Sequence, residues 1–304
     1  MKKNHKIIIS IAILILIAII TLYIQTGFLQ AQSINKRDLS KWTYDSDGII
    51  ENTKEFTLQG SNETCWYLIH GYTSTPDEMT ELAQTINNEF NETVVVTRLK
   101  GHSQTPSQIL NLSLEDWYNQ VDQETDTLKE TCNKINIIGI SFGGTLATRL
   151  AEEKNLNNIY LLAPYLKTPY KFYYILKPET YLETFGPIMH YSKKTKIAQI
   201  NSPEELDKHI AYWNLPFEPV LNSKDFIKQT KENLNKIEEP LLIQHSKNDK
   251  TSDVETSKTI LEKSSSKTKE LILFEKSNHI IIEDYDKEEI MQNIIEFEKK
   301  TRNT

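Results

Sequence analysis

Basic residues are in the minority in this chain of 304 residues. Lysine and arginine number 35 against 42 aspartate and glutamate residues, which gives a formal net charge of -7. This negative balance argues against a nucleic-acid partner, because surfaces that bind nucleic acids need an excess of positive charge. No internal repeat and no low-complexity tract is present, and the composition, 38% hydrophobic and 25% charged, is that of an ordinary globular protein. The length fits one large domain with an insertion.

Cysteine is scarce as well, with Cys65 and Cys132 as the two occurrences. Neither lies near the N-terminus, which excludes a lipoprotein attachment site there. Cys65 begins the apolar segment CWYLIH, and Cys132 lies just ahead of another apolar segment, so neighbouring strands would bring both to the same end of a sheet. An oxidising compartment would permit a disulfide. An offset of one strand often leaves the Cα atoms too far apart, however, and we expect two buried thiols.

The N-terminus differs from the rest of the chain. Three lysines lie among residues 1–6, and residues 7–24 are almost wholly apolar. About 18 such residues nearly span the hydrocarbon core of a bilayer, which is about 30 Å thick. The apolar core of a signal peptide is usually shorter, about 7–15 residues. A buried helix of a soluble core is the poorer interpretation, because no polar face interrupts the run.

We therefore expect a single-pass protein of the cell membrane. Residues 1–6 would form a cytoplasmic tail, residues 7–26 a transmembrane signal anchor and residues 27–46 a polar linker. Lysines ahead of the span place the N-terminus inside and the remaining chain outside. The alternative is a cleaved signal peptide and secretion, although Leu29-Gln30-Ala31, the nearest candidate cleavage site, has the wrong residue at its first position.

From residue 47 onward, short apolar segments alternate with segments of helical pattern. This alternation predicts an α/β fold, a mostly parallel sheet with helices on both faces. Residues 47–165 and 239–300 would form the two parts of this core. Residues 166–238 contain no clear strand and many aromatic residues, which predicts an inserted helical lid. The expected strands are Glu55–Leu58, Cys65–Ile69, Val94–Leu99, Ile135–Ile140, Asn158–Ala163, Pro240–Gln244 and Leu271–Glu275.

One junction between strand and helix carries a chemical signature. Gly139, Ser141 and Gly143 form a Gly-x-Ser-x-Gly sequence between the apolar segment Ile135–Ile140 and a helix expected from Thr145 on. In a nucleophile elbow, a serine occupies a sharp turn from strand to helix, and its Oγ is exposed at the top of the sheet. Glycine is needed two residues before and after it, because strand and helix approach too closely for side chains. Ser141 is therefore the candidate nucleophile.

A serine hydroxyl needs a base to remove its proton and an acid to orient that base. His279 is the candidate base, because it lies shortly after the last expected strand and ahead of the last helix. Asp249 and Asp253 follow the strand Pro240–Gln244. We expect Asp249 to be the acid, since Asp253 fits better as the N-cap of the following helix.

Six motifs resemble the carboxylesterase and monoacylglycerol lipase family of α/β-hydrolases, in order and in spacing. They are LIHGYTSTPDEM, RLKGH, LEDW, IIGISFGG, LIQHSKND and SNH. The resemblance runs from about Gly48 to Lys299 and is weakest in the lid. It implies Ser141, Asp249 and His279 as the catalytic triad. The backbone N–H groups of Tyr72 and Phe142 would then form the oxyanion hole.

The resemblance also implies an activity. We expect a serine hydrolase that cleaves short or medium acyl esters or monoacylglycerol-like lipids through an acyl-enzyme, with no metal and no cofactor. Its partners would be the small ester or lipid substrate and the membrane, and the oligomeric state is left open. Two alternatives remain: hydrolysis or transfer of another acyl group (thioester, amide or cell-envelope lipid), and a non-catalytic binding domain on the same scaffold.

Overall fold

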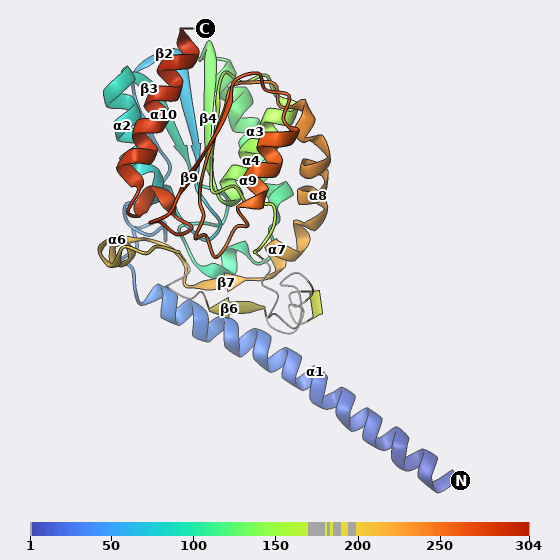
Figure 1. Ribbon diagram of the computed structural model, residues 1–304. Helices are drawn as coiled ribbons and strands as arrows, with labels where there is room; N and C mark the ends of the chain where they lie inside the picture. The colour runs from blue at the N-terminus through green and yellow to red at the C-terminus, as the bar shows by residue number, and fades with distance from the viewer. Residues whose placement is uncertain (1, 170–179, 181–182, 185–189, 194–198, 304) are drawn as a thin grey trace.

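A seven-stranded sheet forms the centre of the protein in this computed structural model, which describes residues 2–169, 180, 183–184, 190–193 and 199–303 (Figure 1). Its order is β1-β3-β2-β4-β5-β8-β9. Within it β1 is antiparallel to β3, and the other neighbours pair in parallel. The seven expected strands are confirmed, with ends shifted by up to four residues. They are β1 (Phe56–Leu58), β2 (Ser61–Ile69), β3 (Glu92–Thr97), β4 (Lys134–Ile140), β5 (Ile159–Leu162), β8 (Leu241–Ser246) and β9 (Lys269–Phe274).

Helices cover both faces of this sheet, as Figure 1 shows. One face packs against α2 and α10 through residues such as Leu82 and Ile290, and the other against α3, α4 and α9 through Leu146 and Ile260. Successive side chains of a strand point to opposite faces, which gives one sheet two apolar cores. The elements are η1 (Pro76–Met79), α2 (Thr80–Phe90), η2 (Pro106–Ile109), α3 (Leu114–Lys129), α4 (Phe142–Glu153), α9 (Glu255–Lys263), η5 (Ile281–Glu283) and α10 (Lys287–Arg302). This arrangement confirms the expected α/β class.

The insertion between the two parts of the core is not wholly helical. A two-stranded antiparallel sheet pairs β6 with β7, so the expectation of a purely helical lid is wrong. Short extended segments of three residues give no clear alternating pattern, which is why the sequence does not indicate them. Residues 170–179, 181–182, 185–189 and 194–198 of the predicted lid lie outside the described residues. The described elements are β6 (Tyr191–Lys193), α6 (Pro203–Lys208), β7 (Asn214–Pro216), α7 (Glu218–Asn222), α8 (Lys224–Asn233) and η4 (Leu234–Lys236).

The N-terminal helix α1 (Lys2–Leu39) extends away from the sheet (Figure 1). The segment expected as a linker over residues 27–46 is therefore helical as far as Leu39. Near its end, Asp38 is buried and its Oδ1 accepts a hydrogen bond of 2.9 Å from Asn214 Nδ2. For residues 22–26, the last five of the predicted span, the structure describes the backbone and not the side chains. The described part of the chain contains no helix that is long and apolar enough to cross a membrane, so the predicted transmembrane segment is not supported.

The two cysteines form a disulfide, contrary to the expectation of two buried thiols. The Cα atoms of Cys65 and Cys132 are 5.9 Å apart, well within the range that a disulfide needs. Cys65 pairs with Ile135 across β2 and β4, and the turn ahead of β4 folds back so that Asn133 N–H donates to Asn62 O at 3.1 Å. This turn brings Cys132 over the neighbouring strand. We expected free thiols because an offset of one strand alone leaves the two Cα atoms too far apart. The turn ahead of β4 shortens this distance.

Candidate active site

Ser141 lies at the sharp junction between β4 and α4, at the carboxyl end of the sheet. Its backbone is strained, with φ 55° and ψ -118°. A residue with a side chain rarely adopts such angles, and at a strand-to-helix turn they point the side chain outward. Helix α4 begins directly after the serine, at Phe142, and not near Thr145 as expected. The N-terminal N–H groups of the helix therefore lie next to the serine.

The two glycines of this turn are required by contacts with neighbouring backbone. A Cβ atom on Gly139 would lie 2.2 Å from the carbonyl oxygen of Gly143. A Cβ atom on Gly143 would lie 2.2 Å from the carbonyl oxygen of Ile69, on β2. Real Cβ atoms do not approach backbone this closely, so any larger residue would force the strand and the helix apart. The geometric role predicted for both glycines is thus present.

Ser141, His279 and Asp249 form a continuous chain of hydrogen bonds. The Oγ of Ser141 lies 2.8 Å from Nε2 of His279, and Nδ1 of His279 lies 2.7 Å from Oδ2 of Asp249. The three side chains come from the ends of different strands, β4, β8 and β9, which meet at one edge because the strands are parallel. All three are nearly buried, so these bonds operate away from bulk water.

The carboxylate of Asp249 is fully occupied by donors. Its Oδ1 accepts hydrogen bonds from the backbone N–H groups of Thr251 and Ser252, at 2.7 and 2.8 Å. Burial acts to raise the pKa of Asp249, but the charge of His279 and the hydrogen bonds from His245 and His279 outweigh it and hold the pKa well below its usual range. Asp249 is therefore an ionised hydrogen-bond acceptor near neutral pH.

The other candidate acid, Asp253, lies away from this chain. Its carboxylate forms an ion pair of 3.1 Å with Lys167 and accepts a hydrogen bond from Glu255 N–H at the start of α9. The carboxylate thus lies at the start of the helix, but the N-cap residue is Val254, so the predicted N-cap position of Asp253 is wrong by one residue. Of the two aspartates, the structure brings only Asp249 to His279.

Tyr72 and Phe142 lie side by side next to the serine. Their rings stack with centroids 5.1 Å apart, and the hydroxyl of Tyr72 donates a hydrogen bond of 2.8 Å to Pro216 O, on β7. In the described part of the chain, neither backbone N–H has a hydrogen-bond acceptor. Two such donors beside a nucleophile are what a developing oxyanion needs. The structure thus leaves both predicted donors available.

Comparison with known proteins agrees with this geometry. The family model Hydrolase_4, described as serine aminopeptidase S33, matches residues 60–286. The chain belongs to this family. It is a serine hydrolase of the carboxylesterase and lipase type, with the α/β-hydrolase fold that the resemblance implied.

Individual relatives of this serine hydrolase cover most of its length. It is 29% identical over 238 residues to a thermostable monoacylglycerol lipase of Bacillus sp. (strain H-257), covering 76% of this chain and 88% of the relative. It is 23% identical over 253 residues to a carboxylesterase of Bacillus subtilis (strain 168), covering 83% and 98%. A solved structure from LipS and LipT, two metagenome-derived lipolytic enzymes, superposes with a TM-score of 0.71 at 22% identity. The match covers 83% of this chain and 99% of that one.

Two further histidines of the serine hydrolase support the loop that carries Tyr72. The buried ring of His70 accepts a hydrogen bond from Leu99 N–H at its Nε2, and burial lowers the pKa of His70 to about 4. His102 accepts one from Thr73 N–H at 3.1 Å. Both rings thus accept hydrogen bonds from backbone N–H groups.

Glu78 and His245 are site residues that the sequence analysis missed. Glu78 is 3% exposed, and its Oε1 accepts a hydrogen bond from the backbone N–H of Gly71, directly before Tyr72. Burial and the nearby charge of Glu283 raise the pKa of Glu78 to about 7. His245 touches Asp249. For Glu78 no sequence signal distinguishes this role, whereas the position of His245 four residues before the acid was visible.

In the described part of the chain, three residues of types that can bind a metal ion lie close together near the loop of Gly71 and Tyr72. Ligand atoms of Glu78, His209 and Glu283 lie within 4.8 Å of one another. Both oxygens of Glu78 already accept hydrogen bonds, from Gly71 N–H and the Ser74 hydroxyl, and Nδ1 of His209 lies 2.5 Å from Glu283 Oε2. The hydrogen bonds of Glu78 and His209 thus lie at the loop of Gly71 and Ser74 and at the segment of Glu283.

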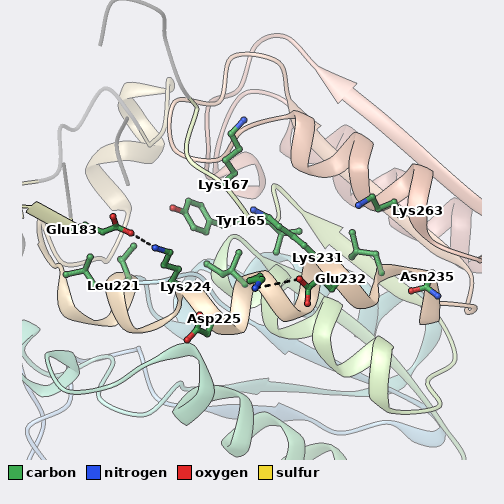
Figure 2. A pocket seen from close by; sticks show the side chains of 15 residues that line it. Tyr165, Lys167, Glu183, Leu221, Lys224, Asp225, Lys231, Glu232, Asn235 and Lys263 are labelled. Carbon is green, nitrogen blue, oxygen red and sulfur yellow. Dashed lines mark hydrogen bonds and ion pairs between the residues drawn. The ribbon is translucent and has the colours of Figure 1, made fainter. Parts of the chain in front are cut away.

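A cavity of about 680 Å³ lies to one side of the triad, between α8, the residues after β5 and the end of α9. None of Ser141, Asp249 and His279 lines it. Figure 2 shows Lys224 and Lys231 of α8 along it, with Lys224 paired to Glu183. The ammonium group of Lys228 lies 4.0 Å from the carboxylate of Glu232. Tyr165 connects the cavity to the site, because its ring packs against Phe142 with centroids 4.9 Å apart.

Proposed function

We propose that this protein hydrolyses carboxylic esters through a Ser141–His279–Asp249 triad and an acyl-enzyme. The observation that carries the proposal is the unbroken hydrogen-bond chain from Ser141 Oγ to Asp249 Oδ2. The ester preference is supported by the relatives whose names are carboxylesterase and monoacylglycerol lipase. Short or medium acyl esters and monoacylglycerol-like lipids are the proposed substrates.

The proposed reaction has two halves. Ser141 Oγ attacks the ester carbonyl while His279 Nε2 takes its proton, and the resulting oxyanion accepts hydrogen bonds from the N–H groups of Tyr72 and Phe142. His279 then gives the proton to the leaving alcohol, and the acyl group stays on Ser141. Water, deprotonated by His279, attacks the acyl carbon of this acyl-enzyme. The bond to Ser141 Oγ then breaks, His279 returns the proton to Oγ, and the acid is released. Asp249 keeps the imidazole in the tautomer that has its proton on Nδ1.

The test is hydrolysis of a panel of acyl esters of graded chain length by protein lacking residues 1–30. We expect release of acid, and loss of at least about a thousandfold in kcat in Ser141→Ala, because the nucleophile is removed. A panel without any turnover contradicts the ester proposal, and an unchanged rate in Ser141→Ala contradicts the assigned nucleophile. Thioester and amide substrates in the same panel separate the alternative acyl-transfer activities.

The localisation expected from the sequence, an extracytoplasmic catalytic domain at the cell membrane, stays a prediction. The Cys65–Cys132 disulfide favours an oxidising compartment. In α1, the large apolar side chains between Ile7 and Ile20 are 48–66% exposed, an apolar surface of the kind that associates with lipid or another protein. Fractionation of cells that express the full chain tests this. Protein found in the cytoplasmic fraction with two free thiols contradicts the prediction.

A further inference from the structure

A second imidazole binds the triad acid. His245 belongs to β8, is 0% exposed, and its Nε2 lies 3.0 Å from Oδ2 of Asp249. The same oxygen lies 2.7 Å from Nδ1 of His279. One carboxylate oxygen therefore receives hydrogen bonds from two histidines, of which the proposed mechanism uses one. In the described part of the chain, these two rings are the titratable groups in contact with Asp249.

The protonation of His245 follows from its two neighbours. An ionised carboxylate can only accept hydrogen bonds, so Nε2 of His245 carries a proton and donates it to Asp249. On the other side, Nδ1 lies 2.6 Å from Oγ of Ser257, in α9. When the Ser257 hydroxyl donates to Nδ1, His245 is neutral, with its single proton directed at the acid.

We propose that His245 is a positioning residue for Asp249, that it weakens the hold of this carboxylate on the His279 proton, and that Ser257 fixes its tautomer. This inference rests on the proposed function, because it concerns the same triad. Oδ2 shares its negative charge between two donors, so each bond is weaker than it would be alone. Without His245, Oδ2 of Asp249 would bind the protonated form of His279 more strongly.

The surroundings of Asp249 separate this effect from a loss of structure. Its Oδ1 is bound by the N–H groups of Thr251 and Ser252, and neither bond involves His245. The carboxylate is thus expected to keep its orientation in a His245 variant. The change should appear in the pH dependence of the serine's reactivity, at low pH, and much less at high pH, where His279 is neutral in either protein.

The experiment measures the second-order rate constant for labelling Ser141 with a fluorophosphonate, from pH 5 to 9, in the full-length protein. This reagent reacts with an activated serine and needs no ester substrate. The variants are His245→Leu, which removes the donor, and His245→Gln, whose amide can restore a donor to Asp249. Ser257→Ala removes the hydroxyl that fixes the tautomer. Thr256→Val is the matched control, since Thr256 Oγ1 is buried on the same helix and has no hydrogen-bond partner in the described residues.

We expect His245→Leu to raise the midpoint of the acid limb by about one pH unit, which lowers labelling about tenfold at pH 5.5 and less than about twofold at pH 9. His245→Gln should restore the wild-type midpoint, Ser257→Ala should shift it in the same direction by less, and Thr256→Val should not shift it. If His245→Leu does not fold, Ser257→Ala against Thr256→Val carries the test.

An unshifted midpoint in both His245→Leu and Ser257→Ala overturns the inference and leaves the triad proposal intact. A His245→Gln midpoint as displaced as that of His245→Leu also overturns it, because shape and not the donor would then matter. Labelling that persists in Ser141→Ala overturns the proposed function, and the inference with it.

Discussion

The strained backbone of Ser141 is tolerated because the surrounding structure determines it completely. The amide of Ser141 donates to Leu162 O on β5, and its carbonyl accepts from the N–H groups of Thr145 and Tyr165. The turn is therefore bonded to three elements: the neighbouring strand β5, the helix α4 and the loop after β5. Backbone strain of this kind costs about 1–3 kcal/mol and persists at functional sites where neighbours enforce it.

Glu152, at the end of α4, is a buried carboxylate whose charge the fold does not neutralise well. It is 7% exposed, Arg149 approaches one oxygen at 3.4 Å, and the other oxygen has no hydrogen-bond partner among the described residues. Burial raises the pKa of Glu152 to about 8. Since the folded protein favours the neutral form, this group stabilises the fold fully below its unfolded pKa, and that stability is lost as the pH rises through about 8.

We therefore predict that Glu152→Gln raises the free energy of unfolding at pH 8.5 by about 1–3 kcal/mol, relative to any difference at pH 4.5, because glutamine cannot ionise. Urea unfolding at both pH values measures this. Glu262→Gln, on the exposed side of α9, is the matched control and should show no such pH dependence. A Glu152→Gln gain that is equal at both pH values would argue against the buried charge.

At the scale of the elements, the strands and the order of the site residues were predictable, and contacts between distant segments were not. The pattern Gly139-x-Ser141-x-Gly143 indicates its turn because the residues that define it are adjacent in sequence. His245 was passed over because its bond to Asp249 depends on how the loop after β8 folds back. The short strands β6 and β7 have too few residues for a pattern. In each case the missing information is a tertiary contact.

The Cys65–Cys132 disulfide connects β2 to the turn ahead of β4, two elements that are adjacent in the sheet and 67 residues apart in the sequence. A bond across a loop of this length restricts the unfolded chain, and its removal typically costs about 2–4 kcal/mol. We predict that a reductant lowers the unfolding temperature of the wild type. The Cys65→Ser/Cys132→Ser double variant should unfold at the temperature of the reduced protein.

Further addition of reductant should not change the double variant, which makes it the control. A thiol assay on the denatured, unreduced protein gives an independent reading, for which we expect no free thiol. Two free thiols, together with an unfolding temperature that does not respond to reductant, would show that the disulfide is absent in solution and does not stabilise the fold.

At the scale of the whole molecule, the site depends on parts of the chain that are far apart. The base, the acid and the nucleophile come from three strand ends of the core. The insertion bonds to the loop after β2, through Tyr212 N–H and Thr73 O, and to the segment that follows His279, through His209 and Glu283. The described residues of the insertion therefore belong to the site structurally. We expect the triad geometry to be independent of residues 1–30, because α1 extends away from the sheet that carries the triad.

The most direct test of the central claim is to locate the residue that a fluorophosphonate modifies in the intact protein, by mass spectrometry of the whole chain and of its peptides. We predict one adduct per chain, on Ser141. It should be absent in Ser141→Ala, and it should form much more slowly in His279→Ala because the base is lost. An unmodified chain, or an adduct on another residue that persists in Ser141→Ala, would contradict the central claim.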